Sequence, residues 1–340
     1  MQEQVDLHPF NTFGLHALAR WYCKVDSLPA LLSALESARA LALPVFVLGG
    51  GSNILLRRDV PGLTLHMDMK GIRVESASDD EILVEAACGE NWHAFVSHCL
   101  AQGWYGLENL ALIPGSVGAA PIQNIGAYGV EVGQRIVSVT VLDPATSEIA
   151  CLAAADCGFG YRDSVFKQQY KGRRIILSVL FRLRRRPEVN LSYAALAQAL
   201  GSNCAPQPAD VFAAVCAIRR SRLPDPALLG NAGSFFKNPV VPVAHYVALQ
   251  QQFPDIPGHP TESAMGACVK IPAAWLIERA GWKGRREGDA GVFEKQPLVL
   301  VNHGHASAQE ILSLAQGIMG DVRSRFGIDL EPEVQWIPES

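Results

Sequence analysis

The sequence has no long apolar run, and its first residues do not form a targeting pattern. No apolar stretch approaches the roughly 18 residues that a membrane-spanning helix needs. The opening MQEQVDLHPF lacks the basic region followed by an apolar region that marks a secretory signal peptide. From these two absences we expect a cytoplasmic protein that does not insert into a membrane.

A strong excess of either charge is also missing. The net charge is −4, and charged residues make up 18% of the chain. Such a chain is not expected to bind nucleic acid or an anionic membrane as its main activity. Basic residues do cluster locally, at residues 182–186, 219–222 and 283–286. A short basic cluster is usually a solvated face, but these clusters also suit a phosphorylated small molecule.

The cysteines form no CxxC pair. In a chain of this length we expect reduced, mostly buried thiols of a cytosolic protein. A catalytic thiol remains open, although nothing in the local sequence favours one. The eight cysteines are Cys23, Cys88, Cys99, Cys151, Cys157, Cys204, Cys216 and Cys268.

At 340 residues the chain is long enough for two or three domains with their own cores. Hydrophobic periodicity and capping residues predict helices at 27–43, 90–102, 208–221, 241–253, 272–280 and 307–326. Alternating runs predict strands at 44–48 and 173–183, and hairpins at 71–87 and 135–152. Because hairpins and helices are mixed without steady βαβ alternation, we expect an α+β fold.

A first glycine-rich segment, GGGSN, covers Gly49, Gly50, Gly51, Ser52 and Asn53 and follows a predicted strand. It is neither a Walker A loop nor a GxGxxG turn. Bare backbone N–H groups in such a turn suit a diphosphate. Taken alone, the segment is equally well explained as a simple glycine-rich turn.

A second glycine-rich segment, at residues 115–129, changes that balance. It is long, rich in small residues and without a clear period, and long ordered loops are usually functional. Two such loops suit a large, flat, phosphate-bearing cofactor, and a flavin dinucleotide fits best. The alternative is a structural Ω-loop, which we consider the weaker explanation.

Several motifs carry a family resemblance over nearly the whole chain. In order they are ENLALIPGSVGAAPIQNIGAYGVE, FGYRDSVFK, LPDP, GNAGSFFKNP and LEPEV. Together they resemble the UDP-N-acetylenolpyruvoylglucosamine reductase family. The segment LSYAALAQAL at residues 191–200 resembles the subtype with a tyrosine-bearing loop over the substrate.

The resemblance implies an FAD-binding fold of the vanillyl-alcohol-oxidase type, with two subdomains and a C-terminal α+β substrate domain. We place the first subdomain at 1–70, joined by 327–340, the second at 71–222, and the substrate domain at 223–326. The family binds FAD noncovalently and uses NADPH as co-substrate. Reduced flavin delivers hydride from N5 to the terminal enolpyruvyl carbon of UDP-N-acetylglucosamine enolpyruvate. The product is UDP-N-acetylmuramate, a peptidoglycan precursor.

That chemistry needs charge stabilisation and a proton donor. Arg162 is the natural stabiliser of the enolate, because a guanidinium stays charged and forks onto a carboxylate; the plainer explanation is an ion pair with Asp163. Ser234, beside two phenylalanines and Lys237, is the expected proton donor. The alternative is that Ser234 is a helix N-cap or turn residue, which is the commoner role of a serine after a glycine. Either Glu331 or Glu333 can help to hold the substrate carboxylate, since alternation in a strand points both the same way. The family motif LxxEV selects Glu333.

The resemblance also implies the residues that bind the ligands. For the UDP part and the substrate we expect Tyr161, Tyr193, Arg222 and Asn238. Two departures from the family pattern stand out: Arg286 falls where some relatives carry glutamine, and Gln335 falls where arginine is common. For the flavin we expect Gly49, Gly50, Gly51, Ser52, Asn53, Pro114, Gly115, Ser116, Gly118, Asn124, Gly126 and Arg219.

Two further expectations concern metals and partners. His303 and His305 resemble a metal pair, but no third ligand lies at a convincing spacing, so we expect no catalytic metal. We expect a monomer acting on a UDP-sugar and NADPH, without nucleic acid. The competing hypotheses are a flavoprotein oxidase with the same cofactor fold and a sugar-nucleotide-binding protein without turnover.

Overall fold

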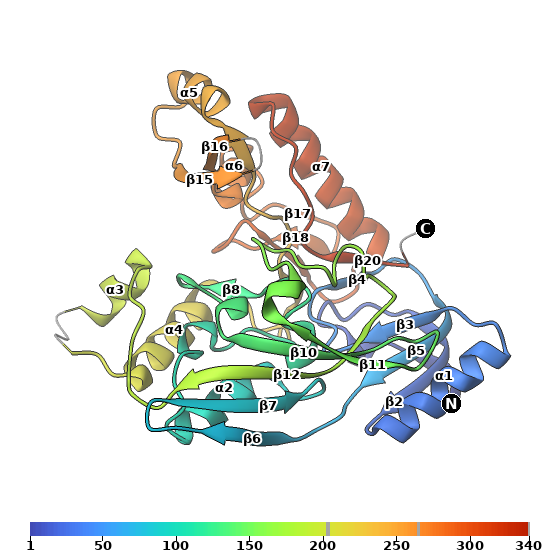
Figure 1. The fold of residues 1–340 in the computed structure, drawn as a ribbon. Coiled ribbons are helices and arrows are strands. Elements are labelled where there is room, and N and C mark those ends of the chain that lie inside the picture. The colour runs from blue at the N-terminus through green and yellow to red at the C-terminus, as the bar shows by residue number, and fades with distance from the viewer. Residues whose placement is uncertain (202–204, 264–265, 339–340) are drawn as a thin grey trace. The chain divides into compact units, whose positions relative to one another are not determined.

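The described chain forms two compact units, which are drawn in Figure 1. The computed structural model describes residues 1–201, 205–263 and 266–338; Cys204 and the last two residues of the predicted 327–340 segment lie outside them. Each unit is assembled from separated pieces of chain. The first unit comprises Met1–Asp6, Leu18–Gly51 and Asp59–Ser221, and the second comprises Leu7–Ala17, Ser52–Arg58 and Arg222–Ser340.

The first unit contains a four-stranded sheet in the order β1-β2-β5-β3. Its strands are β1 (Gln2–Asp6), β2 (Leu18–Val25), β3 (Val45–Leu48) and β5 (Val60–Met67). Strands β2 and β3 both run parallel to β5, whereas β1 is antiparallel to β2. Helix α1 (Leu28–Ala40) begins after Ser27 and packs against β2 and β5. Strand β3 ends at the first glycine-rich segment, as the sequence predicts.

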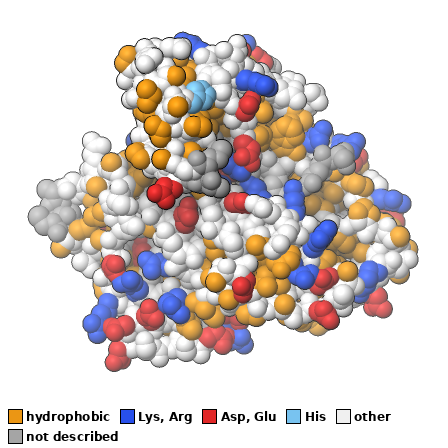
Figure 2. Space-filling view, turned by 45° about the horizontal axis from the view of Figure 1, so that its top comes forward, with side chains coloured by type: hydrophobic (Ala, Val, Ile, Leu, Met, Phe, Trp, Pro, Cys, Tyr) orange, Lys and Arg blue, Asp and Glu red, His pale blue; other side chains and the backbone are white. Residues whose placement is uncertain are grey.

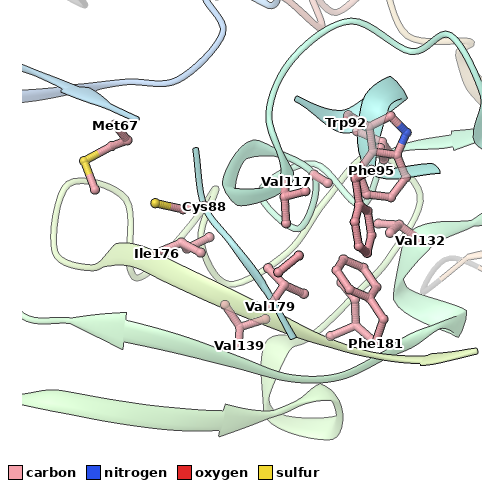
Figure 3. Packing of buried hydrophobic residues seen from close by; sticks show 14 of the residues in the cluster. Met67, Cys88, Trp92, Phe95, Val117, Val132, Val139, Ile176, Val179 and Phe181 are labelled. Atoms are coloured by element: carbon pink, nitrogen blue, oxygen red, sulfur yellow. The ribbon is translucent and has the colours of Figure 1, made fainter. Parts of the chain in front are cut away.

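A second, antiparallel sheet of the first unit has the order β11-β10-β12-β7-β6. Its core is aromatic: the Trp92 ring lies 6.0 Å from Phe95 and 6.1 Å from Phe181 between ring centroids. Figure 3 shows Val117, from the second glycine-rich segment, among these core side chains. The elements are β6 (Ile72–Ala77), β7 (Glu81–Ala87), β10 (Ile136–Leu142), β11 (Ile149–Ala153), β12 (Ile175–Arg184), α2 (Trp92–Ala101), α3 (Ala194–Leu200) and α4 (Pro208–Arg222).

Within its described residues, the second unit combines three small sheets with the helices α5, α6 and α7. The sheets have the orders β13-β19-β18-β17, β14-β16-β15 and β20-β4. Helix α7 packs on β18, β19 and α6, and it begins with the capping box that Ser307 and Glu310 predict. The elements are β4 (Ile54–Leu56), β13 (Gly230–Ser234), β14 (Val240–Pro242), β15 (His259–Ser263), β16 (Gly266–Lys270), β17 (Arg286–Glu287), β18 (Ala290–Val292), β19 (Val299–Asn302), β20 (Gln335–Ile337), α5 (Val243–Gln252), α6 (Ala273–Arg279) and α7 (Ala308–Phe326).

Most of the predicted elements are confirmed within two or three residues. The six predicted helices correspond to α1, α2, α4, α5, α6 and α7, and the predicted strands and hairpins to β3, β12, β6–β7 and β10–β11. The prediction missed α3, β1, β2 and β5 and the small strands of the second unit other than β19, which the apolar run LVLVN before His303 predicts. The long loop at 115–129 is largely irregular, with a 3-10 turn at Val117–Ala119 and a two-residue strand β8 (Gly126–Ala127) paired with β9 (Val130–Glu131). The domain boundaries stay a prediction.

Candidate functional site

The two glycine-rich segments of the first unit lie against each other. A Cβ atom placed on Gly50 would lie 2.9 Å from the Cα of Gly115, and one placed on Gly49 would lie 2.8 Å from the Oγ of Ser116. Backbone can approach backbone this closely only where no side chain intervenes. The glycines are therefore needed for the contact between the two loops. The structure thus joins the two segments that the sequence assigns to one cofactor.

The second segment is fixed to the stretch that enters α2. Gly118 N–H donates to the Cys88 carbonyl at 2.9 Å, and Val117 N–H donates to the Glu90 carbonyl at 2.9 Å. Trp92 N–H donates to the Gly115 carbonyl at 3.0 Å. Gly118 has no room for a side chain, because its Cβ would lie 2.5 Å from that of Cys88. The backbone around Pro114, Gly115 and Ser116 is consequently held from one side by hydrogen bonds.

Asn124 organises the rest of that segment with its side chain. Its Nδ2 donates to Glu131 Oε2 at 2.9 Å and to the Gly160 carbonyl at 3.0 Å, while its Oδ1 accepts from Gly133 N–H at 2.8 Å. Asn124 is buried and has a positive φ of 44°, which asparagine tolerates better than most residues. Because its amide is used inside the protein, any cofactor contact of Asn124 would come from its backbone.

Arg162 reaches the same segment from the loop after Gly160. Its Nη2 donates to the Gly126 carbonyl at 2.8 Å, and its guanidinium lies 5.5 Å from the centroid of the Tyr161 ring. Asp163, the partner in the plainer explanation, accepts hydrogen bonds from Ser164 N–H and from Gln168. The backbone of Arg162 is left-handed, with φ of 55°. Such a conformation is costly for an arginine and is typical of functional sites.

Arg219, on α4, brings a second positive charge to this region. Its Nε donates to the Leu112 carbonyl at 3.1 Å, and its side chain also hydrogen-bonds Tyr128. Burial lowers the pKa of the Arg219 guanidinium, and the nearby charge of Arg162 acts in the same direction. A guanidinium nevertheless stays protonated at neutral pH. Two partly buried cations near one glycine-rich segment favour an anionic ligand.

The tyrosine-bearing segment is joined to the glycine-rich segment. Tyr193 is 44% exposed, and its ring packs edge-on against Tyr128 at 5.2 Å between centroids. Asn109 is buried, and its Nδ2 donates to the carbonyls of Tyr128 and Asn190, both at 2.9 Å. The Tyr193 segment is thereby held at the end of the glycine-rich segment. Tyr161, the other predicted substrate tyrosine, is 36% exposed.

In the second unit, Ser234 ends strand β13 opposite Val299 of β19. The register of this pair shifts between Asn231 and Ser234, where Gly233 has a positive φ of 68°. The two phenylalanines after the serine are fully buried and lie 5.1 Å apart between ring centroids. Their rings belong to the core of this unit, so they fix the backbone that follows the half-buried serine.

Glu331 and Glu333 differ, which corrects the expectation that alternation points both the same way. Glu331 is exposed and forms an ion pair with Lys237, whereas Glu333 is 8% exposed. The segment is not a strand here, and Pro332 forms only an isolated bridge to Phe236. Lys237, the cation near the expected proton donor in sequence, therefore pairs with Glu331. Burial distinguishes Glu333 as the carboxyl with a protected environment.

Glu333 is also tied to Ser234 and to the first glycine-rich segment through the backbone. Its N–H donates to the carbonyl of Phe235, the residue after Ser234, at 2.8 Å. Asn53 Nδ2 donates to the Glu333 carbonyl at 3.3 Å, and Gln335 N–H donates to the Asn53 carbonyl at 3.0 Å. The second unit thus gathers Ser52–Asn53, Ser234 and Glu333.

The remaining predicted substrate residues also lie in the second unit. Asn238 Oδ1 accepts from Ala273 N–H at 2.9 Å, at the start of α6, so a substrate contact would use its Nδ2. Arg222 ends α4 and is exposed. The proposed chemistry requires the side chains of Arg162 and Ser234 to act on one substrate. Arg162 belongs to the first unit and Ser234 to the second, so this requirement stays a prediction.

Three other groups of side chains were candidates for a site: the described cysteines, the histidines and the basic clusters. Burial raises the pKa of Cys88 to about 12 and that of Cys157 to about 11, so these thiols stay protonated near neutral pH. Cys151 is exposed and Cys23 half-buried, unlike the other described cysteines. Within the described residues, no group of three or more His, Cys, Asp or Glu side chains is placed to hold a metal ion. Across the same residues, no helix combines the length and apolarity that crossing a membrane requires.

The basic clusters are largely neutralised. Arg182, Arg184 and Arg186 form ion pairs with Glu81, Glu188 and Asp80. In the cluster at 283–286, Lys283, Arg285 and Arg286 pair with Glu278, Glu287 and Asp289. Figure 2 shows the same mixture, with basic and acidic side chains interspersed on the face in view. These two clusters are solvated faces, and 219–222 is the one that contributes an arginine near the glycine-rich segments.

Reasoning from the sequence missed Asn109 and Tyr128 as parts of the site. Both occur in the motif stretch that carries the resemblance. A signal for Asn109 was present, because an asparagine within the apolar run LENLAL is buried, and buried amides need hydrogen-bond partners. No sequence signal identifies its partners, since Asn190 lies 81 residues away.

Comparisons with known proteins identify relatives over nearly the whole chain. A family model described as UDP-N-acetylenolpyruvoylglucosamine reductase, C-terminal domain, matches residues 225–337, and one described as FAD binding domain matches residues 19–151. A UDP-N-acetylenolpyruvoylglucosamine reductase of Chromobacterium violaceum is 51% identical over 332 residues, covering 97% of this chain and 96% of the relative. One of Pseudomonas putida is 49% identical over 334 residues, covering 98% and 97%.

Solved structures show the same fold. The crystal structure of UDP-N-acetylenolpyruvylglucosamine reductase from Thermus caldophilus matches with a TM-score of 0.68 at 24% identity, covering 98% of each chain. A solvent-stable cholesterol oxidase matches with a TM-score of 0.50 at 12% identity, covering 95% of this chain and 85% of that one. These matches confirm the predicted α+β fold of the FAD-binding type with a C-terminal domain.

Proposed function

The chain belongs to the UDP-N-acetylenolpyruvoylglucosamine reductase family, and from that premise we propose that it reduces UDP-N-acetylglucosamine enolpyruvate to UDP-N-acetylmuramate with NADPH as the electron source. The product would feed peptidoglycan synthesis, and we expect a cytoplasmic monomer. The observation that carries the proposal is the grouping of Arg162 and Arg219 at two touching glycine-rich segments. That grouping suits an anionic cofactor beside an anionic substrate.

The residues present fit FAD. Gly49 and Gly50 leave no space against Gly115 and Ser116, so the site presents backbone instead of side chains, as a diphosphate and a flat ring require. When bound, the flavin supplies hydride to the enolpyruvyl terminal carbon after it has been reduced by NADPH. The residues proposed to hold it are Gly49, Gly50, Gly51, Ser52, Asn53, Pro114, Gly115, Ser116, Gly118, Asn124, Gly126 and Arg219.

Arg162 and Glu333 are proposed to hold the substrate carboxylate. Negative charge spreads onto that carboxylate as the adjacent double bond is reduced, and a fixed guanidinium stabilises the charge as it develops. The Arg162 side chain is already oriented by the Gly126 carbonyl, so little reorganisation is needed. The backbone of Glu333 is held at both of its polar groups: its N–H donates to the Phe235 carbonyl, and its carbonyl accepts from Asn53 Nδ2.

Ser234 is proposed to protonate the carbon next to the carboxylate. A serine hydroxyl is a weak acid, so it can serve as a proton donor only if it is held in place next to the carbon that accepts the proton. The core phenylalanines that follow it and the pairing with Val299 fix its backbone. Tyr161, Tyr193, Arg222 and Asn238 are proposed to bind the UDP-sugar, by ring contacts, hydrogen bonds and charge.

The two half-reactions test this proposal separately. The purified chain should be yellow, NADPH should bleach it without air, and the enolpyruvyl substrate should restore the flavin spectrum after NADP removal. Ser234→Ala should leave bleaching largely intact and slow reoxidation by about 10²–10⁴-fold. Ser313→Ala, at an exposed position on α7, is the matched control and should leave both rates unchanged.

Three results would count against the proposal. A chain that does not take up FAD would eliminate it. A reduced protein that air reoxidises rapidly, coupled to turnover of an alcohol, would favour the oxidase. Normal reoxidation in Ser234→Ala would remove the serine from its role while leaving the family reaction in place.

A further inference from the structure

A histidine outside the predicted site is hydrogen-bonded to the backbone that leads into the second glycine-rich segment. His93 lies in the first turn of α2, and its Nδ1 accepts from Leu112 N–H at 3.0 Å. Leu112 precedes Pro114 by two residues. The bond therefore fixes the chain immediately before the predicted flavin loop.

Leu112 has a backbone conformation that needs such support. Its φ is 58°, in the left-handed region that leucine adopts only at a cost in free energy. Both polar groups of the residue are engaged by side chains: His93 accepts its N–H, and Arg219 Nε donates to its carbonyl at 3.1 Å. Side chains of α2 and α4 therefore both hydrogen-bond the backbone of Leu112.

The ring of His93 is itself oriented. It stacks on Phe212 of α4, with centroids 5.4 Å apart and planes inclined by 11°. Because Nδ1 accepts a hydrogen bond, the proton of the neutral ring is on Nε2. The hydrogen bonds described above connect residues 88–93 with residues 112–118. The bond from Leu112 to His93 involves a titratable side chain, whereas the others join backbone groups.

From this arrangement we propose that His93 is a positioning residue for FAD binding: by accepting the Leu112 N–H it holds Leu112 left-handed and so sets the path of Pro114, Gly115 and Ser116. This inference rests on the proposed function, because it takes that loop as part of the flavin site. His93 itself touches neither the cofactor nor the substrate in this scheme.

The bond requires a neutral imidazole. The charged groups that face the ring are Arg219 and Arg220 of α4, while Phe212 of the same helix is neutral. Burial lowers the pKa of His93, and the two arginines act in the same direction. Protonation would place a hydrogen on Nδ1 and break the bond to Leu112. Since the native state lowers the pKa of the ring, the bond to Leu112 persists below the ordinary histidine pKa of about 6.5 and is lost as pH falls through the lowered pKa of the folded ring.

Two substitutions separate the acceptor from the ring. His93→Asn keeps an acceptor near the Nδ1 position and removes the titration, whereas His93→Phe keeps the stack on Phe212 and removes the acceptor. We would remove FAD from the protein and titrate it back by the quenching of flavin fluorescence, from pH 8 down to the lowest pH at which the protein stays folded. Near-ultraviolet circular dichroism of each variant would establish that it is folded.

We expect the wild-type dissociation constant for FAD to stay constant through the ordinary histidine pKa and to rise about tenfold where pH falls through the lowered pKa of the folded His93 ring, the effect of one lost hydrogen bond. His93→Asn should bind within about threefold of wild type at pH 7.5 and show a flat pH profile. His93→Phe should bind about tenfold more weakly at every pH.

The inference is overturned if His93→Phe binds FAD as tightly as wild type, if His93→Asn keeps the wild-type pH slope, or if wild-type affinity rises in acid. The last result would mean that a charged His93 attracts the diphosphate instead. Wild-type protein that binds no FAD at any pH would refute the proposed function itself. The two failures are therefore distinguishable.

Discussion

In the first unit, side-chain hydrogen bonds supplement the backbone bonds that hold the predicted site loops, whereas in the second unit Ser234 and Glu333 lie on backbone paired over a hydrophobic core. In the first unit, Asn109, Asn124 and Arg219 bind the carbonyls and N–H groups of irregular loops. In the second, the backbone around Ser234 pairs with β19, and that of Phe235 with Glu333.

The difference shows where each region is vulnerable. The loops of the first unit depend on a few individual polar contacts. Several of their residues have a left-handed backbone, namely Leu112, Asn124, Tyr128 and Arg162. Losing one of them should alter ligand binding while most of the packing remains. A site carried by paired strands depends on the buried side chains beneath it, so core substitutions should lower stability before they alter binding at the loops.

The largest effect is expected from emptying the core below Ser234. Phe235→Ala should lower the free energy of unfolding by about 3–5 kcal/mol, because it removes a fully buried ring that contacts Phe13 and Phe236. Urea unfolding would measure the change. Val247→Ala, at a position 46% exposed on α5, should change it by less than about 0.5 kcal/mol.

FAD affinity measured on the folded Phe235→Ala protein should stay close to wild type. Should the variant not fold, Phe235→Leu offers a smaller cavity and the same comparison. A large loss of FAD affinity without a loss of stability would break the distinction between the two regions.

A smaller effect, confined to binding, is expected from the contact between the glycine-rich segments. Gly50→Ala would place a methyl group 2.9 Å from Gly115 Cα and 3.2 Å from its carbonyl carbon, so backbone must move. We expect FAD affinity to fall about 100-fold, or about 2.7 kcal/mol. Fluorescence titration would measure it.

The matched control is Gly320→Ala on α7, where an added Cβ meets nothing within 4 Å. Alanine in a helix should raise the free energy of unfolding by up to about 1 kcal/mol and leave FAD affinity unchanged. Equal FAD affinity in Gly50→Ala and wild type would show that the close contact of the two segments is not needed for the cofactor.

The smallest effect is expected at the link between the Tyr193 segment and the glycine-rich segment. Asn109→Ala removes two hydrogen bonds, to the Tyr128 and Asn190 carbonyls. We expect KM for the UDP-substrate to rise about tenfold, while flavin reduction by NADPH keeps its wild-type rate. Steady-state and stopped-flow measurements would separate the two.

Ser192→Ala is the comparison variant for Asn109→Ala. Its hydroxyl donates to Asn190 Oδ1 from an exposed position, so its removal should change KM by less than about threefold. A slowed reduction by NADPH in Asn109→Ala would mean that the amide supports the flavin instead of the substrate loop.

Much of the fold could be predicted where the signals are local. Helix α7 illustrates this, because a serine, a glutamate three residues later and a periodic apolar face define it in one stretch. Strand β5 was missed for the opposite reason. Its Pro61 and Gly62 indicate a turn, yet Gly62 is required where the strand passes the Pro44 carbonyl, which a Cβ would approach to 2.1 Å.

The same contrast between local and distant signals applies to the residues of the candidate site. The glycine-rich segments can be recognised from the sequence, because backbone without side chains requires a concentration of glycine. The grip on Leu112 is not visible, because His93 and Arg219 lie 19 and 107 residues from it. Strand alternation could not tell Glu331 from Glu333, because it does not apply where Pro332 forms only an isolated bridge, and it was the family motif that selected Glu333.

Strand β4 can find its partner only late in synthesis. Ile54–Leu56 pairs in parallel with Gln335–Ile337, about 280 residues further along the chain. A ribosome must therefore make nearly the whole sequence before the segment carrying Glu333 can dock, while the first unit needs nothing beyond Ser221. During translation the nascent chain would carry an early piece of its second unit unassembled, which makes that piece the natural point for chaperone contact or proteolytic rejection.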